Sequence, residues 1–317
     1  MITSTVHKRS SYDGFTAALT SLMSERRDVA ILECRKVYPE ASAELQMPNR
    51  RIRVPVAEQD TVLTAAGVAL GGFIVYTDTP HSPLLIARAY EQIRSAVAVP
   101  NLKVMISSVH DGDSFYRDGA VRQMFEDFAL MRAVPNMAVF APSDYCSAYA
   151  LTCSFVKRDG PAYIRLSRHE DEDMYGEDDE FHPGGAMLVR EGNGVTICAN
   201  GMMVREALTA SEILRQQGIE AEIIDCYSIE PFPEQMLLAS VRRTGCCVVT
   251  EKHIETGGLF GAVSECLGRG YTVPVRGVAM AGGFGQSGLA RELNEYYGLT
   301  YKEIVHNVVQ VWAMRRR

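Results

Sequence analysis

Short apolar runs alternate with helical patterns along nearly the whole chain, and this alternation limits the fold more than any other feature. In the first half, the runs that read as strands are residues 28–33, 72–76, 102–106, 137–140 and 162–165. Patterns typical of helices of about 10 to 15 residues accompany them, at residues 12–24, 84–97, 125–132 and 145–157. Strands separated by such helices predict a parallel sheet with helices on both faces.

The second half repeats the alternation after an acidic interruption. Residues 170–180 are almost wholly acidic, and such a run repels itself, so we expect a solvated linker there. Beyond it, strand patterns lie at residues 194–198, 221–225, 245–250 and 273–277, and helical patterns at 204–217, 234–243, 258–268, 289–297 and 301–311. The expected fold class is α/β with two domains, each a mostly parallel sheet flanked by helices. The predicted boundaries are residues 1–168, an acidic linker at 169–183, and residues 184–317.

Composition and charge exclude several classes of protein. The net charge of −7 argues against nucleic acid or an anionic membrane as the main partner, because both need a basic face. No apolar run approaches the roughly 20 residues needed to span a bilayer, and the first residues lack the apolar core of a signal peptide. We therefore expect a cytoplasmic protein. The eight cysteines lie mostly in apolar stretches without a Cys-x-x-Cys pair, which predicts buried, reduced thiols.

Glu58 follows a short apolar strand and begins a helical pattern. The next residues, 61–70, are small and apolar (TVLTAAGVAL), which is typical of a helix packed on all sides. Glu58 is then expected at a buried helix start, where the helix dipole favours a carboxylate that still needs a hydrogen-bond donor. The alternative is an ordinary capping glutamate in the first helical turn.

Residues 109–123 form a long loop that is rich in glycine and charge. The loop follows a predicted parallel strand, so it lies at the carboxyl edge of the sheet, where open α/β sheets bind ligands. A long surface loop would be polar in any case, which leaves a purely structural alternative open. Its charged side chains are His110, Asp111, Asp113, Arg117, Asp118 and Arg122.

Residues 283–288 match the G-x-G-x-x-G pattern of dinucleotide-binding loops. That pattern requires a further strand to carry the acid that binds the ribose. Only helical patterns follow residue 290, so we expect no nicotinamide site there.

Several sequence blocks resemble transketolase. The match to its pyrimidine-binding domain lies in Glu58 with its neighbours and in residues 88–94 (RAYEQIR), 126–136 (EDFALMRAVPN), 141–144 (APSD) and 163–168 (YIRLSR). Residues 251–258 (EKHIETGG) and 284–288 (FGQSG) resemble blocks of the transketolase C-terminal domain. The blocks keep the family's order from about residue 9 to residue 308. Nothing resembles the glycine-rich diphosphate and Mg²⁺ site of the N-terminal domain, so the chain resembles the C-terminal subunit of a split transketolase.

The resemblance implies thiamine diphosphate as cofactor and assigns a role to Glu58. The cofactor becomes a nucleophile when a carboxyl group, hydrogen-bonded to its pyrimidine ring, drives the ring to the imino form. Burial raises the pKa of such a carboxyl and helps it share its proton. In this resemblance the cofactor-binding residues are Glu58, Arg88 and, where the family places phenylalanines on the pyrimidine face, His81 and Leu84.

The resemblance also assigns substrate residues. His110 matches a histidine that reaches the substrate phosphate and is expected, with Glu58, to be catalytic. Asp118 matches an aspartate that contacts a substrate hydroxyl, and Arg168 matches an arginine that holds the phosphate together with that histidine. Arg9 matches a further phosphate arginine.

Some positions depart from the family pattern. Arg122 stands in Val121-Arg-Gln123 where the family has Thr-His-Gln, and Pro55 replaces a glycine. A fixed positive charge at Arg122 cannot act as a base near neutral pH, and it favours a substrate with an anionic group close to the reaction centre. The alternative is that Arg122 pairs with Asp111 or Asp113 in its own loop.

The resemblance therefore implies a transketolase-like transferase that moves a two-carbon ketol unit and is active only with a companion subunit. That companion would carry the diphosphate and Mg²⁺ site in an α2β2 assembly, and the substrate would be a sugar phosphate or another anionic small molecule. Two alternatives remain: the β subunit of a 2-oxoacid dehydrogenase E1 component, and a non-catalytic subunit that stabilises or regulates its partner. The sequence names neither donor, acceptor, pathway nor companion chain.

Overall fold

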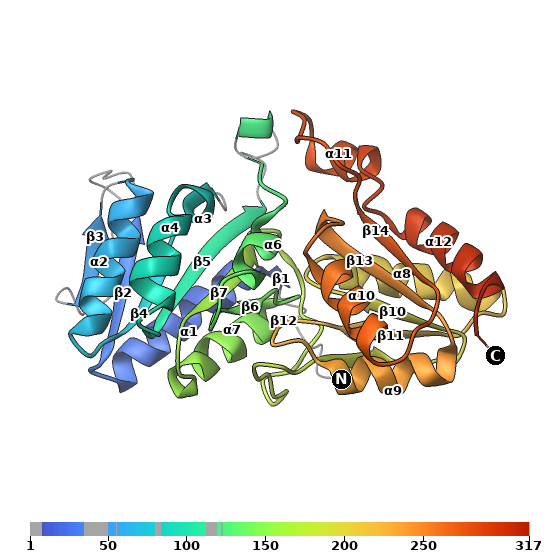
Figure 1. Ribbon diagram of the computed structural model, residues 1–317, viewed down its shortest axis with the longest axis horizontal. Coiled ribbons are helices and arrows are strands. Elements are labelled where there is room, and N and C mark those ends of the chain that lie inside the picture. Colours follow the sequence, from blue (N-terminus) through green and yellow to red (C-terminus); the bar gives the residue numbers. More distant parts are fainter. Residues whose placement is uncertain are drawn as a thin grey trace, which may run out of the picture.

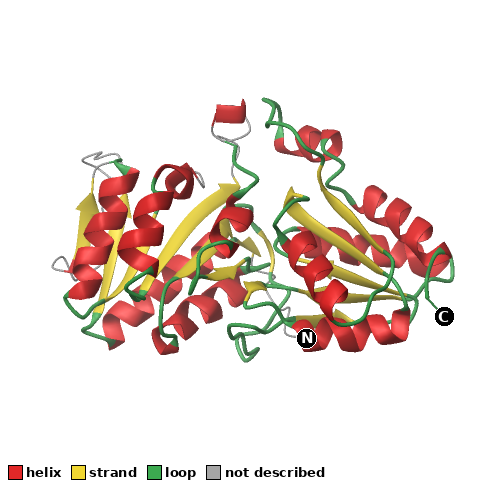
Figure 2. Ribbon diagram, in the orientation of Figure 1, coloured by secondary structure: helices red, strands yellow, loops and turns green. Residues whose placement is uncertain are grey.

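The computed structural model places two α/β domains side by side, joined through the middle of the chain (Figure 1). The structure describes residues 8–34, 50–54, 56–79, 84–111, 119–121 and 123–316. In each domain, helices cover a central sheet (Figure 2). The expected class, two domains with mostly parallel sheets flanked by helices, is confirmed.

The first sheet has seven strands within the described residues, in the order β12-β6-β7-β5-β4-β2-β3. Every pairing is parallel except that of β12 with β6. All five residues of β4 are buried, as expected for a parallel strand covered on both faces. The strands are β2 (Val29–Cys34), β3 (Arg51–Val54), β4 (Ile74–Asp78), β5 (Val104–Asp111), β6 (Ala138–Phe140), β7 (Ala162–Ser167) and β12 (Ser228–Glu230).

Helices cover both faces of this sheet. On one face, α1 (Ser11–Glu25) and α7 (Tyr145–Ser154) pack against Tyr76 and its neighbours. The other face holds α2 (Glu58–Leu70), α3 (Leu84–Arg88), α4 (Tyr90–Gln92) with the π-helix Ile93–Ala98, and α6 (Asp127–Arg132). The helical pattern expected at about residues 84–97 is confirmed in extent, but it is divided into α3, α4 and the π-helix. The break lies at Ala89, next to the Arg88 carbonyl that accepts a hydrogen bond from Gln59 Nε2 at 3.2 Å.

The second sheet has the order β14-β13-β10-β11-β9 within the described residues. Only β9 runs antiparallel. Its strands are β9 (Met187–Arg190), β10 (Val195–Ala199), β11 (Ala221–Asp225), β13 (Cys247–Ile254) and β14 (Val275–Met280). One face packs against α8 (Met203–Gln216) and α12 (Tyr301–Ala313), and the other against α9 (Glu234–Thr244) and α10 (Leu259–Arg269). The short helix α11 (Ala290–Tyr296) lies before α12.

The two halves interlock more than the sequence predicts. Strand β12 follows β11 in the second half, yet it pairs with β6 at the end of the first sheet. In the acidic segment, β8 (Asp171–Glu172) pairs with β1 (Lys8–Arg9), and Phe181 is only 5% exposed. Residues 176–180 are exposed, as expected for a solvated linker, but Tyr175 and Phe181 beside them pack against the first-domain core and Tyr227.

The cysteines follow the expectation where they are described. The seven cysteines other than Cys34 are free thiols, and all but Cys153 are buried. In the described part of the chain, every helix is too short or too polar to cross a membrane.

Candidate active site

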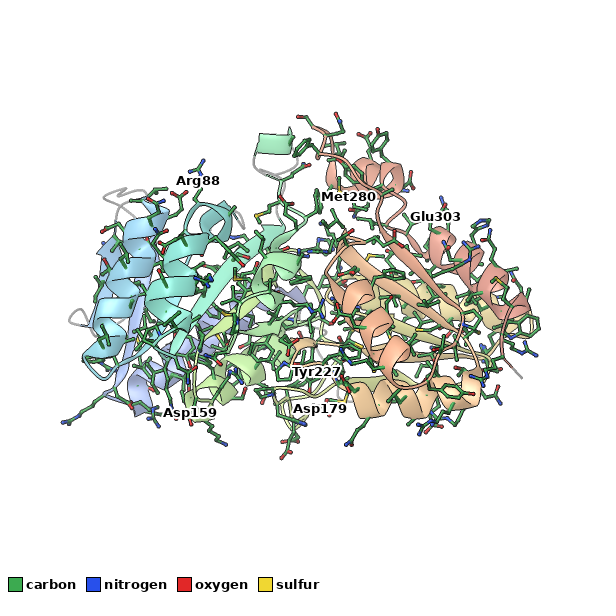
Figure 3. All side chains as sticks on the ribbon, in the orientation of Figure 1. Arg88, Asp159, Asp179, Tyr227, Met280 and Glu303 are labelled. Carbon is green, nitrogen blue, oxygen red and sulfur yellow. The ribbon has the colours of Figure 1, made fainter. Side chains whose placement is uncertain are left out.

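The carboxyl ends of the parallel strands bring several predicted site residues to one edge of the first sheet. Glu58 lies just after β3, His110 is the second-last residue of β5, and Arg168 follows β7 directly. Open α/β sheets bind ligands at this edge because loops and helix starts meet there. The edge lies at the top of the first domain in Figure 3, where Arg88 is labelled.

Glu58 is the first residue of α2, and its carboxylate faces α3. The Oε1 atom lies 2.8 Å from Nη1 of Arg88. Its side chain is 19% exposed, whereas the Arg88 side chain is 59% exposed. The other carboxylate oxygen, Oε2, has no hydrogen-bond partner among the described residues. One acceptor atom is therefore available at the rim of the site.

Helix α2 is not packed on all sides, which corrects the expectation of a buried helix start. Its inner face buries Val62, Ala65 and Ala66, but Leu63 is 50% exposed and Leu70 is 72% exposed. The small apolar residues 61–70 gave no helical periodicity from which the two faces could be told apart. Glu58 is accordingly partly buried.

Arg168 lies on the other side of the edge, exposed to solvent. Its guanidinium carbon stands 4.6 Å from the centre of the Tyr12 ring. The Tyr12 hydroxyl donates to Oδ1 of the buried Asp78 at 3.0 Å, so an aromatic ring links Arg168 to the end of β4. Tyr12 and Asp78 were not predicted, and no motif in the sequence distinguishes them.

Arg9 binds different partners from Arg168. Its Nε atom donates to Oδ2 of Asp173 at 3.1 Å, and its guanidinium stacks 3.5 Å from the Tyr145 ring centre. In the structure, Arg9 is therefore held by an ion pair and an aromatic ring, and its match to a phosphate arginine stays a prediction.

The remaining predicted residues fall outside the described part of the chain. They are His81, Asp118 and Arg122, together with the side chains of His110 and Leu84. The two alternatives for Arg122 therefore both stay open.

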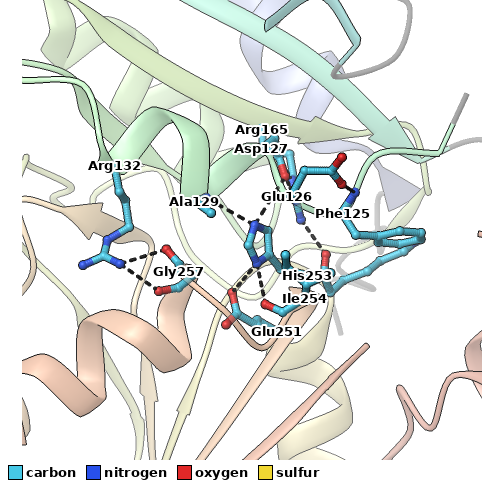
Figure 4. A network of polar contacts seen from close by, with 12 residues as sticks. Phe125, Glu126, Asp127, Ala129, Arg132, Arg165, Glu251, His253, Ile254 and Gly257 are labelled. Carbon is cyan, nitrogen blue, oxygen red and sulfur yellow. Dashed lines mark hydrogen bonds and ion pairs between the residues drawn. The ribbon is translucent and has the colours of Figure 1, made fainter. Parts of the chain in front are cut away.

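A buried ionic network that the sequence did not predict joins the two domains (Figure 4). Arg165 Nε donates to Asp127 Oδ2 at 2.7 Å, and Arg165 Nη1 donates to the Lys252 carbonyl of β13 at 2.7 Å. Tyr163 donates to the same Asp127 carboxylate at 2.5 Å, and burial raises the Tyr163 pKa further above its ordinary value. The Phe128 ring covers Arg165 at 3.7 Å.

His253 extends this network along β13. Its Nδ1 atom lies 2.6 Å from the Ile254 carbonyl, and its Nε2 atom lies 3.3 Å from the backbone nitrogen of Ala129. The carboxylates of Asp127 and Glu251 also lie 4.0 Å from Nε2 and 3.8 Å from Nδ1, so the ring sits between both domains' acidic groups.

Glu251 caps helix α10 from the end of β13. Its carboxylate accepts hydrogen bonds from the backbone N–H groups of Leu259 at 2.7 Å and Phe260 at 2.8 Å. Burial nevertheless raises its pKa to about 7. Residues 251–258, which resemble a block of the transketolase C-terminal domain, thus contain both a helix cap, Glu251, and a contact between the domains, His253.

Asp144, Cys146 and Asp173 lie close enough to share a metal ion, but each has another role in the structure. Asp144 accepts from the Ser147 backbone at 2.8 Å and from two backbone N–H groups of the acidic segment. Asp173 binds Arg9, and burial raises the Cys146 pKa to about 11, so this thiol stays protonated at neutral pH. The cluster acts as a helix cap and ion pair.

Comparison with known proteins places both domains. Residues 8–171 match the transketolase pyrimidine binding domain, and residues 184–304 match the transketolase C-terminal domain. The chain therefore belongs to the transketolase family, whose members are thiamine diphosphate-dependent transferases. Within that family it is a transketolase-like subunit of the split kind, made of the pyrimidine-binding and C-terminal domains.

Individual relatives agree with this assignment. A 6-deoxy-6-sulfo-D-fructose transketolase subunit from Clostridium sp. (strain MSTE9) is 40% identical over 84% of this chain and 82% of its own length. A putative transketolase C-terminal section from Methanocaldococcus jannaschii is 38% identical over 84% of each chain. A solved split gene transketolase, described as an inactive beta4 tetramer, superposes with a TM-score of 0.88 at 32% identity, covering 97% of this chain and 99% of that one.

Proposed function

We propose that this chain, together with a companion subunit, transfers a two-carbon ketol unit from a ketose to an acceptor with thiamine diphosphate as cofactor. The observation that supports this most is Glu58 at the carboxyl edge of the parallel sheet, with Oε2 available on the rim. The companion would hold the diphosphate and Mg²⁺ in an α2β2 assembly in the cytoplasm. The family model supports the cofactor class, and the assembly and its location are part of the proposal.

The described residues fit the pyrimidine end of the cofactor. A carboxyl oxygen without a described partner suits a ring nitrogen, and Arg88 fixes the other oxygen. The resemblance implies that His81 and Leu84 would lie against the ring. Thiamine diphosphate, when bound, supplies the nucleophilic carbon and the electron sink. Glu58 would hold the proton that the ring nitrogen shares, while His110, Asp118 and Arg168 would bind and orient the substrate.

An exposed apolar stripe next to Glu58 supports the companion. Leu63 and Leu70 are 50% and 72% exposed and lie seven residues apart on one side of α2, and Val56, two residues before the helix, is 47% exposed. In the second domain Phe284 is 85% exposed, in the loop after β14 that approaches residues 119–121 (Figure 1). Apolar side chains gathered around a site are typical of protein interfaces. We infer that the companion covers both places.

The substrate is proposed to be an anionic sugar derivative. Arg168 at the edge and Arg122 in the loop bring positive charge, and guanidinium groups bind phosphate and sulfonate oxygens with two hydrogen bonds. The relative from Clostridium is named for a sulfonated fructose, and other relatives for apulose 4-phosphate. Phosphate and sulfonate share the tetrahedral oxyanion that this charge would recognise.

The test is a transfer assay on the reconstituted pair of subunits. We expect ketol transfer from a phosphorylated or sulfonated ketose to an aldehyde acceptor, and no release of CO₂ from pyruvate. Pyruvate decarboxylation without ketose activity would instead assign the chain to the E1 β-subunit class. Absence of both activities, in a complex that assembles, would favour a stabilising or regulatory subunit.

The role of Arg122 is tested by Arg122→His across the same panel of donors and acceptors. A shift toward plain sugar phosphates is expected, with anionic acceptors weakened by roughly 1.5 to 3 kcal/mol, as for a lost hydrogen bond to a charged group. An unchanged profile would favour pairing within the loop.

A further inference from the structure

The second sheet has its own ligand-binding position, separate from the edge that holds Glu58. From β10 the chain runs through α8 to β11 on one side, whereas β13 lies on the other side of β10. The carboxyl ends of β10 and β13 therefore form the topological switch point of this sheet. In open α/β sheets this crevice is where ligands bind.

A pocket of about 60 Å³ lies at this switch point. Residues 200–202 after β10 and Lys252 of β13 line one side of it. The other side is lined by residues 141–144 after β6 and by residues 165–167 of β7, so both domains contribute. The volume suits one small ion and is below the roughly 300 Å³ of pockets that hold a small organic ligand. Arg168 and Glu58 do not line it.

The pocket contains buried donors without described partners. Asn200 is 3% exposed, and its Nδ2 atom makes no hydrogen bond within the described part of the chain. The Nη2 atom of Arg205 is likewise buried and unpaired there. Gly201 has a φ of +53°, which turns the chain from β10 into α8 between these two residues. Buried N–H groups are almost always paired, so two unpaired donors in one pocket indicate an acceptor that is bound there.

The charges of the wall suit a single anion. Arg9, Arg165, Arg205 and Lys252 line the pocket, whereas the first backbone N–H groups of α8 are already bonded to the carbonyls of residues 200–202. The acidic side chains next to these cations already form ion pairs with them. Asp171 binds Arg205 Nε at 2.6 Å, and Asp173 and Asp127 bind Arg9 and Arg165.

Two further carboxylates, those of Asp144 and Glu172, also line the pocket. Asp144 uses its oxygens to cap α7 and to accept from the acidic segment. Glu172 lies in the exposed end of β8. Neither carboxylate is free inside the pocket to compete for its donors.

We propose that this pocket binds one small oxyanion of the phosphate class, held by the unpaired donors of Asn200 and Arg205. Since its walls come from both domains, a bound oxyanion ties them together. The site would sense free phosphate or sulfate independently of the substrate edge.

The test is a calorimetric titration of the full chain with inorganic phosphate at constant ionic strength, beside thermal unfolding with and without phosphate. Wild type is expected to show one saturable site that raises Tm. Asn200→Asp, which sets a carboxylate in place of the donor, should abolish that site, and Arg205→Gln should weaken it at least tenfold. Arg215→Gln on the same helix is the matched control, because Arg215 is 66% exposed and outside the pocket, and it should bind as wild type does.

Three results would overturn the proposal. One is the absence of a saturable phosphate site in wild type, and another is equal weakening by Arg205→Gln and Arg215→Gln. The third is loss of the site in Arg168→Gln with full retention in Arg205→Gln, which would place the phosphate at the substrate edge. Arg205→Gln keeps the test valid if Asn200→Asp fails to fold. The titration needs neither companion nor cofactor, so its failure leaves the ketol-transfer assay unaffected.

Discussion

Glu58 is the residue on which the proposed chemistry depends, and Glu58→Gln keeps its shape while removing the acid. In the reconstituted complex we expect turnover to fall by about 100- to 10,000-fold, the usual contribution of a general acid or base. Deuterium exchange at the reactive carbon of the cofactor, followed by NMR, should fall with it. Asp60→Asn, an exposed carboxylate in the same first turn, is the control and should change neither. Near-normal exchange in Glu58→Gln would reduce Glu58 to a helix cap.

Glu251 gives the fold a pH dependence whose sign follows from its burial. Its pKa is raised from 4.5 to about 7, so the folded chain binds this proton more tightly than the unfolded chain does. The stabilisation is complete below about pH 4.5 and is lost as the pH rises through about 7. We expect the free energy of unfolding, measured with urea, to fall between pH 5 and pH 8 less steeply in Glu251→Gln than in wild type. The exposed Glu303→Gln should keep the wild-type slope, and equal slopes in all three would contradict this assignment.

The residues of the candidate site were only partly accessible to prediction. The place of Glu58 between a strand and a helix was predicted correctly, but its burial was overestimated because residues 61–70 show no helical periodicity. Asp127 and Arg165 lie in sequence blocks that resemble transketolase. Their pairing was missed because they are 38 positions apart and no local pattern joins them. Asn200 gives no sequence signal, since its environment is created by the meeting of two domains.

Among the elements, α2 has a distinctive exposed face. Leu63→Glu and Leu70→Glu should leave the isolated chain's free energy of unfolding within about 0.5 kcal/mol, because neither side chain is in the core. Association with the companion, measured by analytical ultracentrifugation, should weaken at least tenfold as charges enter an apolar interface. Val309→Glu in α12, also exposed, serves as the control and should associate normally. Normal association of both α2 variants would exclude this face as the interface.

The element pattern of the sequence predicted the strong strands and missed the weak ones. Residues 221–225 were predicted as a strand and form β11, because a short apolar run between turns is typical of a buried strand. Strands β9 and β12 were missed because they are short, lie at sheet ends and pair antiparallel. The interruption after Arg88 was missed because no glycine or proline marks it.

At the scale of the whole molecule, the Asp127–Arg165 pair should matter more for stability than any surface pair. The exposed fractions of the two side chains are 0% and 9%. Asp127→Asn leaves a buried guanidinium without its counter-charge, a change that typically costs about 3 to 5 kcal/mol. Arg269→Gln, which breaks a solvent-screened, exposed pair with Glu234, should cost far less. Urea unfolding at pH 7 compares the two, and similar losses would show that the buried network stabilises little.

The order of the two domains could be predicted from the sequence, but their interlocking could not. The sequence blocks that resemble transketolase occur in the family's order along the chain, and this order alone predicts which domain comes first. The pairing of β12 with β6 and of β1 with β8 depends on contacts between the halves, and the strands involved have only two or three residues. Segments this short do not show a recognisable alternation of apolar and polar residues.

We propose above all that this chain supplies the pyrimidine side of a cofactor site and that a companion subunit completes it. Calorimetric titration with thiamine diphosphate and Mg²⁺ tests it most directly, first on the full chain alone and then on the chain with its companion. We predict weak or undetectable binding by the chain alone and tight, Mg²⁺-dependent binding by the pair. Tight, Mg²⁺-dependent binding by the chain alone would contradict the account.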